Sequence, residues 1–118
     1  MTFLNMIGRI YSFEPKVSEG GVKYTDLRLS VKRPYKNYNG TYDNDFFRIA
    51  LFEHHHDSAQ KYFKKGMGIA LKGRLENSRW KDKDENERFS NNIIVESIIF
   101  LPKDIDFETA SEDELEDN

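Results

Sequence analysis

Alternating apolar and polar residues run through most of this chain and predict a protein built mainly of strands. The clearest case is residues 22–33, where Leu27, Leu29 and Val31 share one parity and the residues between them are polar or charged. In the fourth predicted strand we expect every second residue from Met67 to Leu75 to face the core. Alternation, or a dense run of apolar and aromatic residues, marks five strands: residues 3–13, 22–33, 44–53, 67–75 and 89–101.

Residues 54–65 depart from this pattern and predict the one helix. Ala59, Tyr62 and Phe63 form an apolar stripe at the i, i+3, i+4 spacing, and Gly66 ends the segment. The predicted order is therefore three strands, a helix and two strands. In a chain of 118 residues, that order favours an all-β fold, the five-stranded oligonucleotide-binding (OB) barrel, with its helix between the third and fourth strands.

Charge divides the chain into two parts. Residues 104–118 contain eight acidic residues and no Lys or Arg. All 18 basic residues lie in residues 1–103 with the other 13 acidic ones, so the net charge is +5 there and −8 in the tail. We predict an OB-fold domain over residues 1–103. Residues 104–118 are predicted to be a disordered acidic tail, because their few apolar side chains cannot form a core.

Several classes of protein do not fit this composition. The chain has no Cys, and three consecutive histidines, His54 to His56, diverge around a helix rather than converge on one ion, so no metal site is expected. No nucleophile or carboxylate pair lies in a recognisable catalytic motif, so neither an enzyme nor a cofactor is predicted. Without a signal peptide or a run of about 20 apolar residues, we expect a cytoplasmic protein with no membrane association.

The third predicted strand carries the sharpest candidate site. Phe46, Arg48 and Phe52 share one parity and so project from one face. Two rings that flank a guanidinium can stack on bases and bind a phosphate of single-stranded nucleic acid. The alternatives are that Phe52 completes the core and that Phe46 lies in a subunit contact.

Trp80, the only tryptophan, lies between Arg79 and Lys81 in a highly charged hairpin predicted over residues 77–88. Its neighbours offer little local core, so we interpret Trp80 as a stacking residue and Arg79 as a phosphate contact. The alternative is that Trp80 packs against the base of the strands.

Two further groups of basic residues are weaker candidates. Arg33 ends the second predicted strand, and Tyr35 begins a basic and aromatic loop predicted over residues 35–43, where tyrosine is also an ordinary loop residue. Lys72 and Arg74 lie on the outward parity of the fourth strand. They either line a phosphate track or form a solvated face.

Taken in order, these segments resemble the bacterial and phage single-stranded DNA-binding proteins. The resemblance implies an OB fold, sequence-independent binding of single-stranded DNA, and homo-oligomers, with the tetramer favoured over the dimer. It assigns stacking to Phe46, Phe52 and Trp80, with Tyr35 as the nearest counterpart of a second-strand aromatic. The segments that carry it are Asn5–Ile10, Leu27–Arg33, Asp45–Phe52, Ala59–Gly66, Leu71–Leu75 and Trp80–Asp82.

The tail departs from that family's pattern. Many members end in an acidic segment with a terminal Phe that docks replication and repair proteins. Here the similar run, with Ile105 and Phe107 as its apolar anchors, opens the tail, and the chain ends without an aromatic residue. An acidic tail that competes with DNA needs only its charge. The short linker favours a phage or mobile-element member in a bacterial host.

The expected function is therefore to coat single-stranded DNA in replication, recombination or repair. Two alternatives stay open: an OB-fold replication accessory that mainly binds a protein partner, and an RNA-binding module. The sequence separates the last one poorly, because contacting a 2′-hydroxyl needs no diagnostic residue.

Overall fold

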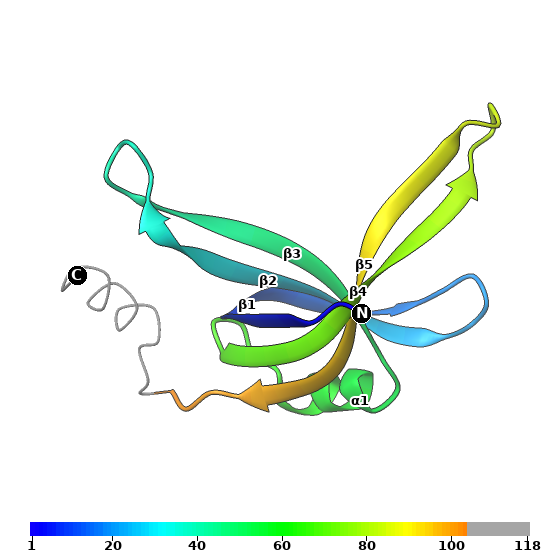
Figure 1. Ribbon diagram of the computed structural model, residues 1–118. Coiled ribbons are helices and arrows are strands. Elements are labelled where there is room, and N and C mark those ends of the chain that lie inside the picture. Colours follow the sequence, from blue (N-terminus) through cyan, green and yellow to red (C-terminus); the bar gives the residue numbers. More distant parts are fainter. Residues whose placement is uncertain (104–118) are drawn as a thin grey trace.

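The computed structural model describes residues 1–103 as five antiparallel strands and one helix in a single sheet of order β3-β2-β1-β4-β5 (Figure 1). The predicted order of elements is confirmed, with the helix between β3 and β4. The predictions for the tail, including Ile105 and Phe107, lie outside the described residues. The elements are β1 (Leu4–Val17), β2 (Lys23–Lys36), β3 (Tyr42–Phe52), α1 (Glu53–Tyr62), β4 (Gly68–Lys81) and β5 (Glu87–Phe100).

Strand β1 holds the sheet together because its two halves pair with different neighbours. Residues 4–9 pair with β4, whereas residues 9–17 pair with β2. A register shift between Ile10 and Ser12 leaves Tyr11 as an extra residue in β1. Such a bulge bends and twists a strand, which lets one sheet curve into a barrel. The edge strands β3 and β5 then face each other.

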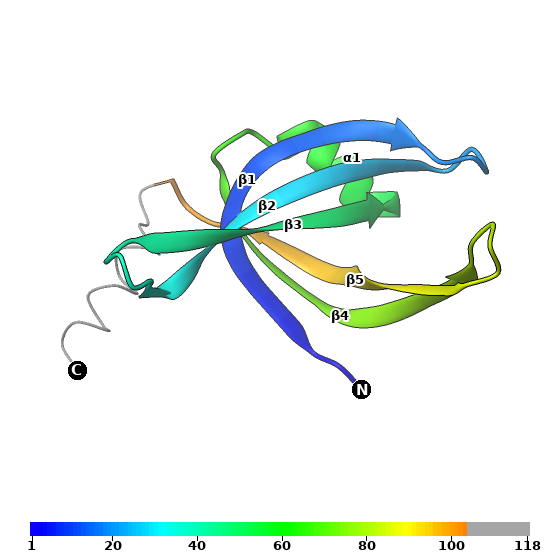
Figure 2. The same ribbon diagram turned by 90° about the horizontal axis from the view of Figure 1, so that it is seen from above.

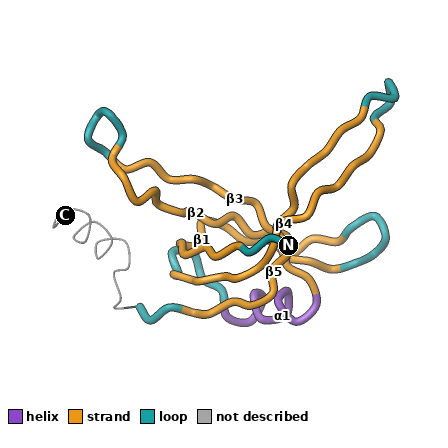
Figure 3. Tube along the Cα trace, in the orientation of Figure 1, coloured by secondary structure: helices purple, strands orange, loops and turns teal. Residues whose placement is uncertain are grey.

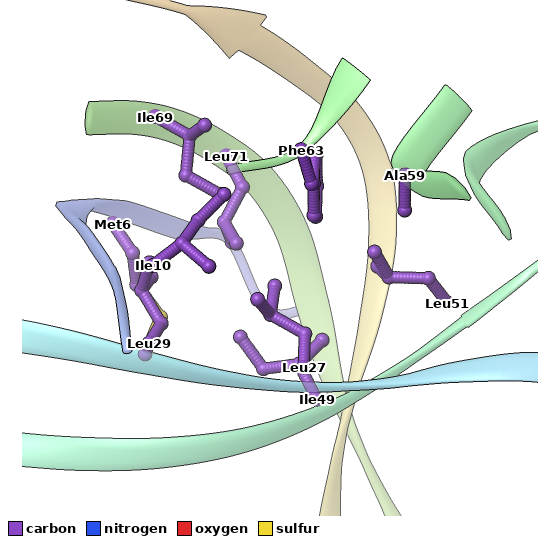
Figure 4. Packing of buried hydrophobic residues seen from close by; sticks show 10 residues of the cluster. All are labelled: Met6, Ile10, Leu27, Leu29, Ile49, Leu51, Ala59, Phe63, Ile69 and Leu71. Carbon is purple, nitrogen blue, oxygen red and sulfur yellow. The ribbon is translucent and has the colours of Figure 1, made fainter. Parts of the chain in front are cut away.

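The core lies inside this curved sheet, and α1 closes one end of it (Figures 2 and 4). The inward parity predicted for the second and third strands is confirmed, since Leu27, Leu29, Ile49 and Leu51 are all buried. Ala59 and Phe63 bring the helix onto the core. The buried hydrophobic residues are Met6, Ile10, Leu27, Leu29, Ile49, Leu51, Ala59, Phe63, Ile69 and Leu71.

One buried polar residue links the helix to the sheet. The Thr25 hydroxyl lies 2.7 Å from Nδ1 of His56 and accepts a hydrogen bond of 3.1 Å from Nε2 of Gln60. These bonds satisfy a hydroxyl that burial would otherwise leave without water. His56 is thus a structural residue of the helix-to-sheet contact.

The strands are longer than the alternation predicted. The expected loop over residues 35–43 shrinks to a short turn, which places Tyr35 within β2. The charged hairpin predicted over residues 77–88 is confirmed, and its ladder continues to the pair Lys81 and Glu87 (Figure 3). Hydrogen bonding between strands does not require an apolar face, so β2 and β3 extend the sheet into residues 35–43, where a loop was expected.

Two predicted apolar contacts are wrong. Leu75 was expected inside but is 42% exposed, because β4 leaves the barrel after a register shift between Lys72 and Gly73. Tyr62 was expected on the apolar stripe of the helix but is exposed. The helix ends at Tyr62, and Phe63 caps it by donating its backbone N–H to the carbonyl of Ala59 at 3.0 Å.

Within residues 1–103 no helix combines the length and apolar character needed to cross a membrane. The same range contains no cluster of three or more His, Cys, Asp or Glu placed to hold a metal ion.

Candidate nucleic-acid interface

An open groove of about 800 Å³ lies between the outer face of β2 and β3 and the facing strand β5. The first residues of α1 close one end of it. Tyr24, Ala50 and Phe52 contribute apolar surface, while Asp26 and Arg48 contribute charge. The β5 side is formed by residues 91–96.

The three candidates of the third strand share the outer face, as predicted. Phe46 is 59% exposed and Phe52 is 46% exposed. Phe52 and Arg48 line the groove, whereas Phe46 lies farther along β3 toward the β2–β3 turn. The alternative in which Phe52 completes the core is wrong, because its parity turns it away from Ile49 and Leu51.

Each of these rings contacts a tyrosine that the sequence reasoning missed. Tyr11 meets Phe46 edge to face, with ring centroids 5.3 Å apart. Tyr24 lies directly across from Phe52 in the ladder, with centroids 5.6 Å apart. The outward parity of the second strand could have revealed Tyr24. Tyr11 follows the buried Ile10 and has the parity opposite to Met6 and Ile10, so the alternation of the first strand could have revealed it as well.

Two further aromatic rings lie on the β4–β5 arm, by which we mean residues 75–93. Trp80 is 50% exposed and Phe89 is 65% exposed. Trp80 is paired with Arg88, and Phe89 is paired with Arg79 on the neighbouring rung. Each face of the arm therefore carries one ring beside one arginine. Trp80 is not part of the core, which contradicts its packing against the base of the strands. Phe89 was missed because exposed strands show no alternation.

Carboxylates hold two of the candidate arginines of β2 and β3. Arg33 donates to Asp45 through Nε and Nη2, with a shortest distance of 2.7 Å. Arg48 donates to Asp26 at 2.9 Å, and Lys16 approaches the same carboxylate at 3.1 Å. The hydrogen bond from Arg48 holds the pKa of the Asp26 carboxyl below its usual range. The carboxylates hold these guanidiniums in fixed orientations. A phosphate that binds either one has to compete with the carboxylate for its N–H donors.

The candidates on β4 divide into paired and unpaired cations. Arg74 donates to Glu76 at 2.8 Å and to Glu96 at 3.1 Å, which raises the pKa of its guanidinium. Lys72 and Arg79 are exposed and form no ion pair within the described part of the chain. Lys72 and Arg79 are therefore the cations available to a phosphate without competition.

The structure distributes most of the predicted residues over three places, whereas Lys72 lies apart from them on the outward face of β4, two residues from Ala70. Arg48 and Phe52 lie in the groove, and Arg74 reaches its rim through Glu96. Arg79 and Trp80 lie on the β4–β5 arm. Phe46, Arg33 and Tyr35 lie toward the β2–β3 turn, which points away from the arm (Figure 1). These candidates thus form an extended surface rather than one compact pocket.

Comparison with known proteins places this chain in a family. Residues 1–101 match the Single-strand binding protein family, so the chain belongs to it. It is 29% identical over 94 residues to Single-stranded DNA-binding protein 1 of Staphylococcus aureus strain MSSA476, covering 79% of this chain and 60% of that protein. Identity is 27% over 97 residues to Single-stranded DNA-binding protein 2 of Listeria monocytogenes, covering 81% and 61%. The chain thus spans about three fifths of these relatives.

Two solved structures have the same fold. One is described as the Plasmodium falciparum SSB complex with ssDNA, with a TM-score of 0.66, 22% identity and coverage of 86% of this chain and 96% of that one. The other is a deletion mutant of the single-stranded DNA binding protein from Thermus aquaticus, with a TM-score of 0.67, 20% identity and coverage of 88% and 52%. The predicted OB fold is confirmed.

Proposed function

We propose that this protein binds single-stranded DNA without sequence preference. The observation that carries the proposal is the set of large exposed rings at Phe46, Phe52, Trp80 and Phe89, which the barrel core does not use. Exposed rings beside cations suit bases and phosphates, and stacking accepts any base. Relatives named for this activity support the same conclusion.

In the proposed complex, the single-stranded DNA lies in the groove and extends onto the β4–β5 arm. Phe52 and Trp80 stack on bases, and Phe46 extends the track along β3. Arg79 neutralises phosphates on the arm, and Arg33, Arg48 and Arg74 contribute where their carboxylate partners leave donors free. Lys72, on the outward face of β4 two residues from Ala70, would meet a phosphate only where the DNA continues beyond the groove. Tyr35 stacks at the far end of β2.

The test uses Trp80, which is the only tryptophan of the chain. Titration with oligo-dT should quench its fluorescence, and oligo-rU of equal length should compete weakly. Equal competition would favour the RNA-binding alternative. Binding seen by anisotropy of a labelled oligonucleotide, without any quenching, would remove Trp80 from the site while leaving the activity in place.

We also propose that copies of the chain associate through the outer face of β1, β4 and β5. Ile7 is paired with Ala70, and Ala70 is paired with Ile99, so the three side chains form one row across three strands. Ile7 and Ile99 are exposed. Ile93, Val95 and Ile98 pack against the core and Ile94 lines the groove, so Ile99 is the residue of the predicted β5 run that lies in this row. Sedimentation should detect an oligomer, and we expect a tetramer. The substitution Ile99→Lys should dissociate it.

For the tail, we propose that its charge of −8 competes with DNA for the basic domain. Truncation after Lys103 should tighten binding to oligo-dT, most at low salt where screening is weakest. If DNA binding is unchanged and a replication or repair protein no longer binds, the tail is a docking peptide, with Ile105 and Phe107 as the first residues to substitute.

A further inference from the structure

Two of the three histidines of the chain lie where the groove ends. Phe52 is the last residue of β3, and Glu53 follows with φ of 53°, in the left-handed region that non-glycine residues rarely adopt. This turn starts α1 and brings His54 and His55 to the groove, where both line the pocket beside Phe52.

The two rings form a pair with one buried and one exposed member. Their centroids are 4.0 Å apart, and the planes are inclined by 42°. His55 is half-buried, and it lines the groove together with Glu96 of β5. Burial lowers the pKa of His55, and the neighbouring His54 lowers it further. His54 is thus the exposed ring of the pair and the one open to a ligand in the groove.

The groove lining around this pair contains more carboxylates than cations. The groove lining contains one arginine, Arg48, and three carboxylates, Asp26 of β2, Glu53 of α1 and Glu96 of β5. Asp26 is paired with Arg48 and Lys16, and Glu96 is paired with Arg74. Glu53 has no ion pair within residues 1–103. The phosphates of a DNA strand in this groove would therefore lie near the Glu53 carboxylate. No cation neutralises that carboxylate unless a neighbouring histidine is charged.

We propose that His54 is a further nucleic-acid contact at the α1 end of the groove. Its ring packs against that of His55, and in its protonated form it binds the DNA backbone. The inference rests on the proposed function and adds a regulated contact to the same site. Its consequence is that DNA binding takes up a proton. An exposed imidazole is the side chain whose charge changes within the physiological pH range, so affinity should depend on pH there.

The experiment measures binding of labelled oligo-dT to the full chain by anisotropy, at equal ionic strength, at about pH 5.8 and about pH 7.8. The unaltered protein should bind roughly three- to tenfold more tightly at the lower pH. His54→Gln should lose this gain. His54→Lys, which fixes the charge, should raise affinity at the higher pH toward the low-pH value and make binding nearly independent of pH.

His56→Gln is the matched control, because His56 bonds to Thr25 and does not line the groove. It should keep the gain, and its melting temperature shows whether the fold survives. Equal affinity of the unaltered protein at both pH values would overturn the inference and leave the proposed function intact. A gain that persists in His54→Gln would also overturn it. Absence of binding at both pH values would instead contradict the proposed function itself.

Discussion

Strands β4 and β5 each run through two regions, the barrel and the β4–β5 arm. The two regions differ in the burial of their side chains but share one hydrogen-bonded ladder. Near the helix, Ile69 and Leu71 are buried in the barrel core. A few residues farther along β4, every side chain from Leu75 to Lys81 is exposed, and the same hydrogen-bonded pairing continues to the turn. Backbone pairing and polar side-chain contacts, such as the hydrogen bond from Asn77 to Asn91, therefore sustain the arm, while side-chain burial sustains the barrel.

This difference separates structural aromatic residues from functional ones. In the barrel, Phe63 packs on Phe13, with centroids 5.7 Å apart, and its burial stabilises the fold. On the β4–β5 arm, Trp80 and Phe89 have no core to join. Large exposed rings on a segment that contributes little to stability are best explained by a ligand.

The junction between the regions depends on one glycine. Gly73 is buried, and a Cβ at this position would overlap the carbonyl oxygen of Ile94. The ladder passes from the pair Lys72 and Ser97 to the pair Gly73 and Val95, so Glu96 is an extra residue in β5. The close approach and the bulge together redirect the strands out of the barrel.

The largest effect should come from a matched pair of leucines on β4. Leu71→Ala should lower the free energy of unfolding by about 2–5 kcal/mol, because it leaves a cavity in the core. Leu75→Ala, on the arm, should lower it by less than about 1 kcal/mol. Chemical denaturation measures both. Equal losses would mean that the arm belongs to the cooperative core.

Gly73→Ala tests the junction itself. The added methyl group has to displace the β5 backbone, at a cost of roughly 1–3 kcal/mol in unfolding free energy. Gly20→Ala is the control, because its Cβ would meet only the Ser18 hydroxyl at 3.9 Å, an ordinary contact. A neutral Gly73→Ala would show that the arm leaves the barrel for another reason.

Trp80→Ala should separate binding from stability. We expect oligo-dT affinity to weaken by about 1–3 kcal/mol, since one stacking surface is lost. The melting transition should stay nearly unchanged. Anisotropy of a labelled oligonucleotide is the appropriate measurement, because the variant has no tryptophan. Tyr62→Ala, an exposed ring on α1, is the control and should bind as the unaltered protein does. The opposite pattern would assign Trp80 a structural role.

Arg48→Ala should change the salt dependence of binding. If Arg48 neutralises one phosphate, the slope of log affinity against log salt should become shallower by about 0.7. Lys23→Ala, on the same strand pair but outside the groove lining, should change the slope less. An unaltered slope for Arg48→Ala would mean that Arg48 stays bonded to Asp26 in the complex and neutralises no phosphate.

The smallest effect concerns the Asp26 carboxylate. Its pKa lies below the ordinary 3.8, chiefly through the hydrogen bond from Arg48. Because the folded pKa is depressed, the stabilisation is present above about pH 4 and is lost as pH falls through the folded value. Asp26→Asn should therefore cost less than about 1 kcal/mol at neutral pH, since Arg48 is exposed to solvent. The difference should vanish in acid, and a cost that grew with falling pH would contradict this sign.

The sequence predicted most of the barrel because parity is a local property. The inward set of β2 and β3 and the outward set of Phe46, Arg48 and Phe52 follow from a period of two residues. The same rule failed at Leu75, beyond the Gly73 junction. There β4 leaves the core, so a residue of inward parity is no longer buried, and alternation cannot express that change.

Which residues lie side by side was decided only in the folded chain. The sequence by itself determined the order of the elements, the two faces of each central strand and the division of charge. The tertiary structure decided that β5 faces β3 across a groove, that Asp26 and Asp45 hold the arginines, and that His54 stands beside Phe52. The physical reason is that a strand's faces depend on its neighbours in sequence, whereas a groove depends on how the whole sheet curves to bury its core.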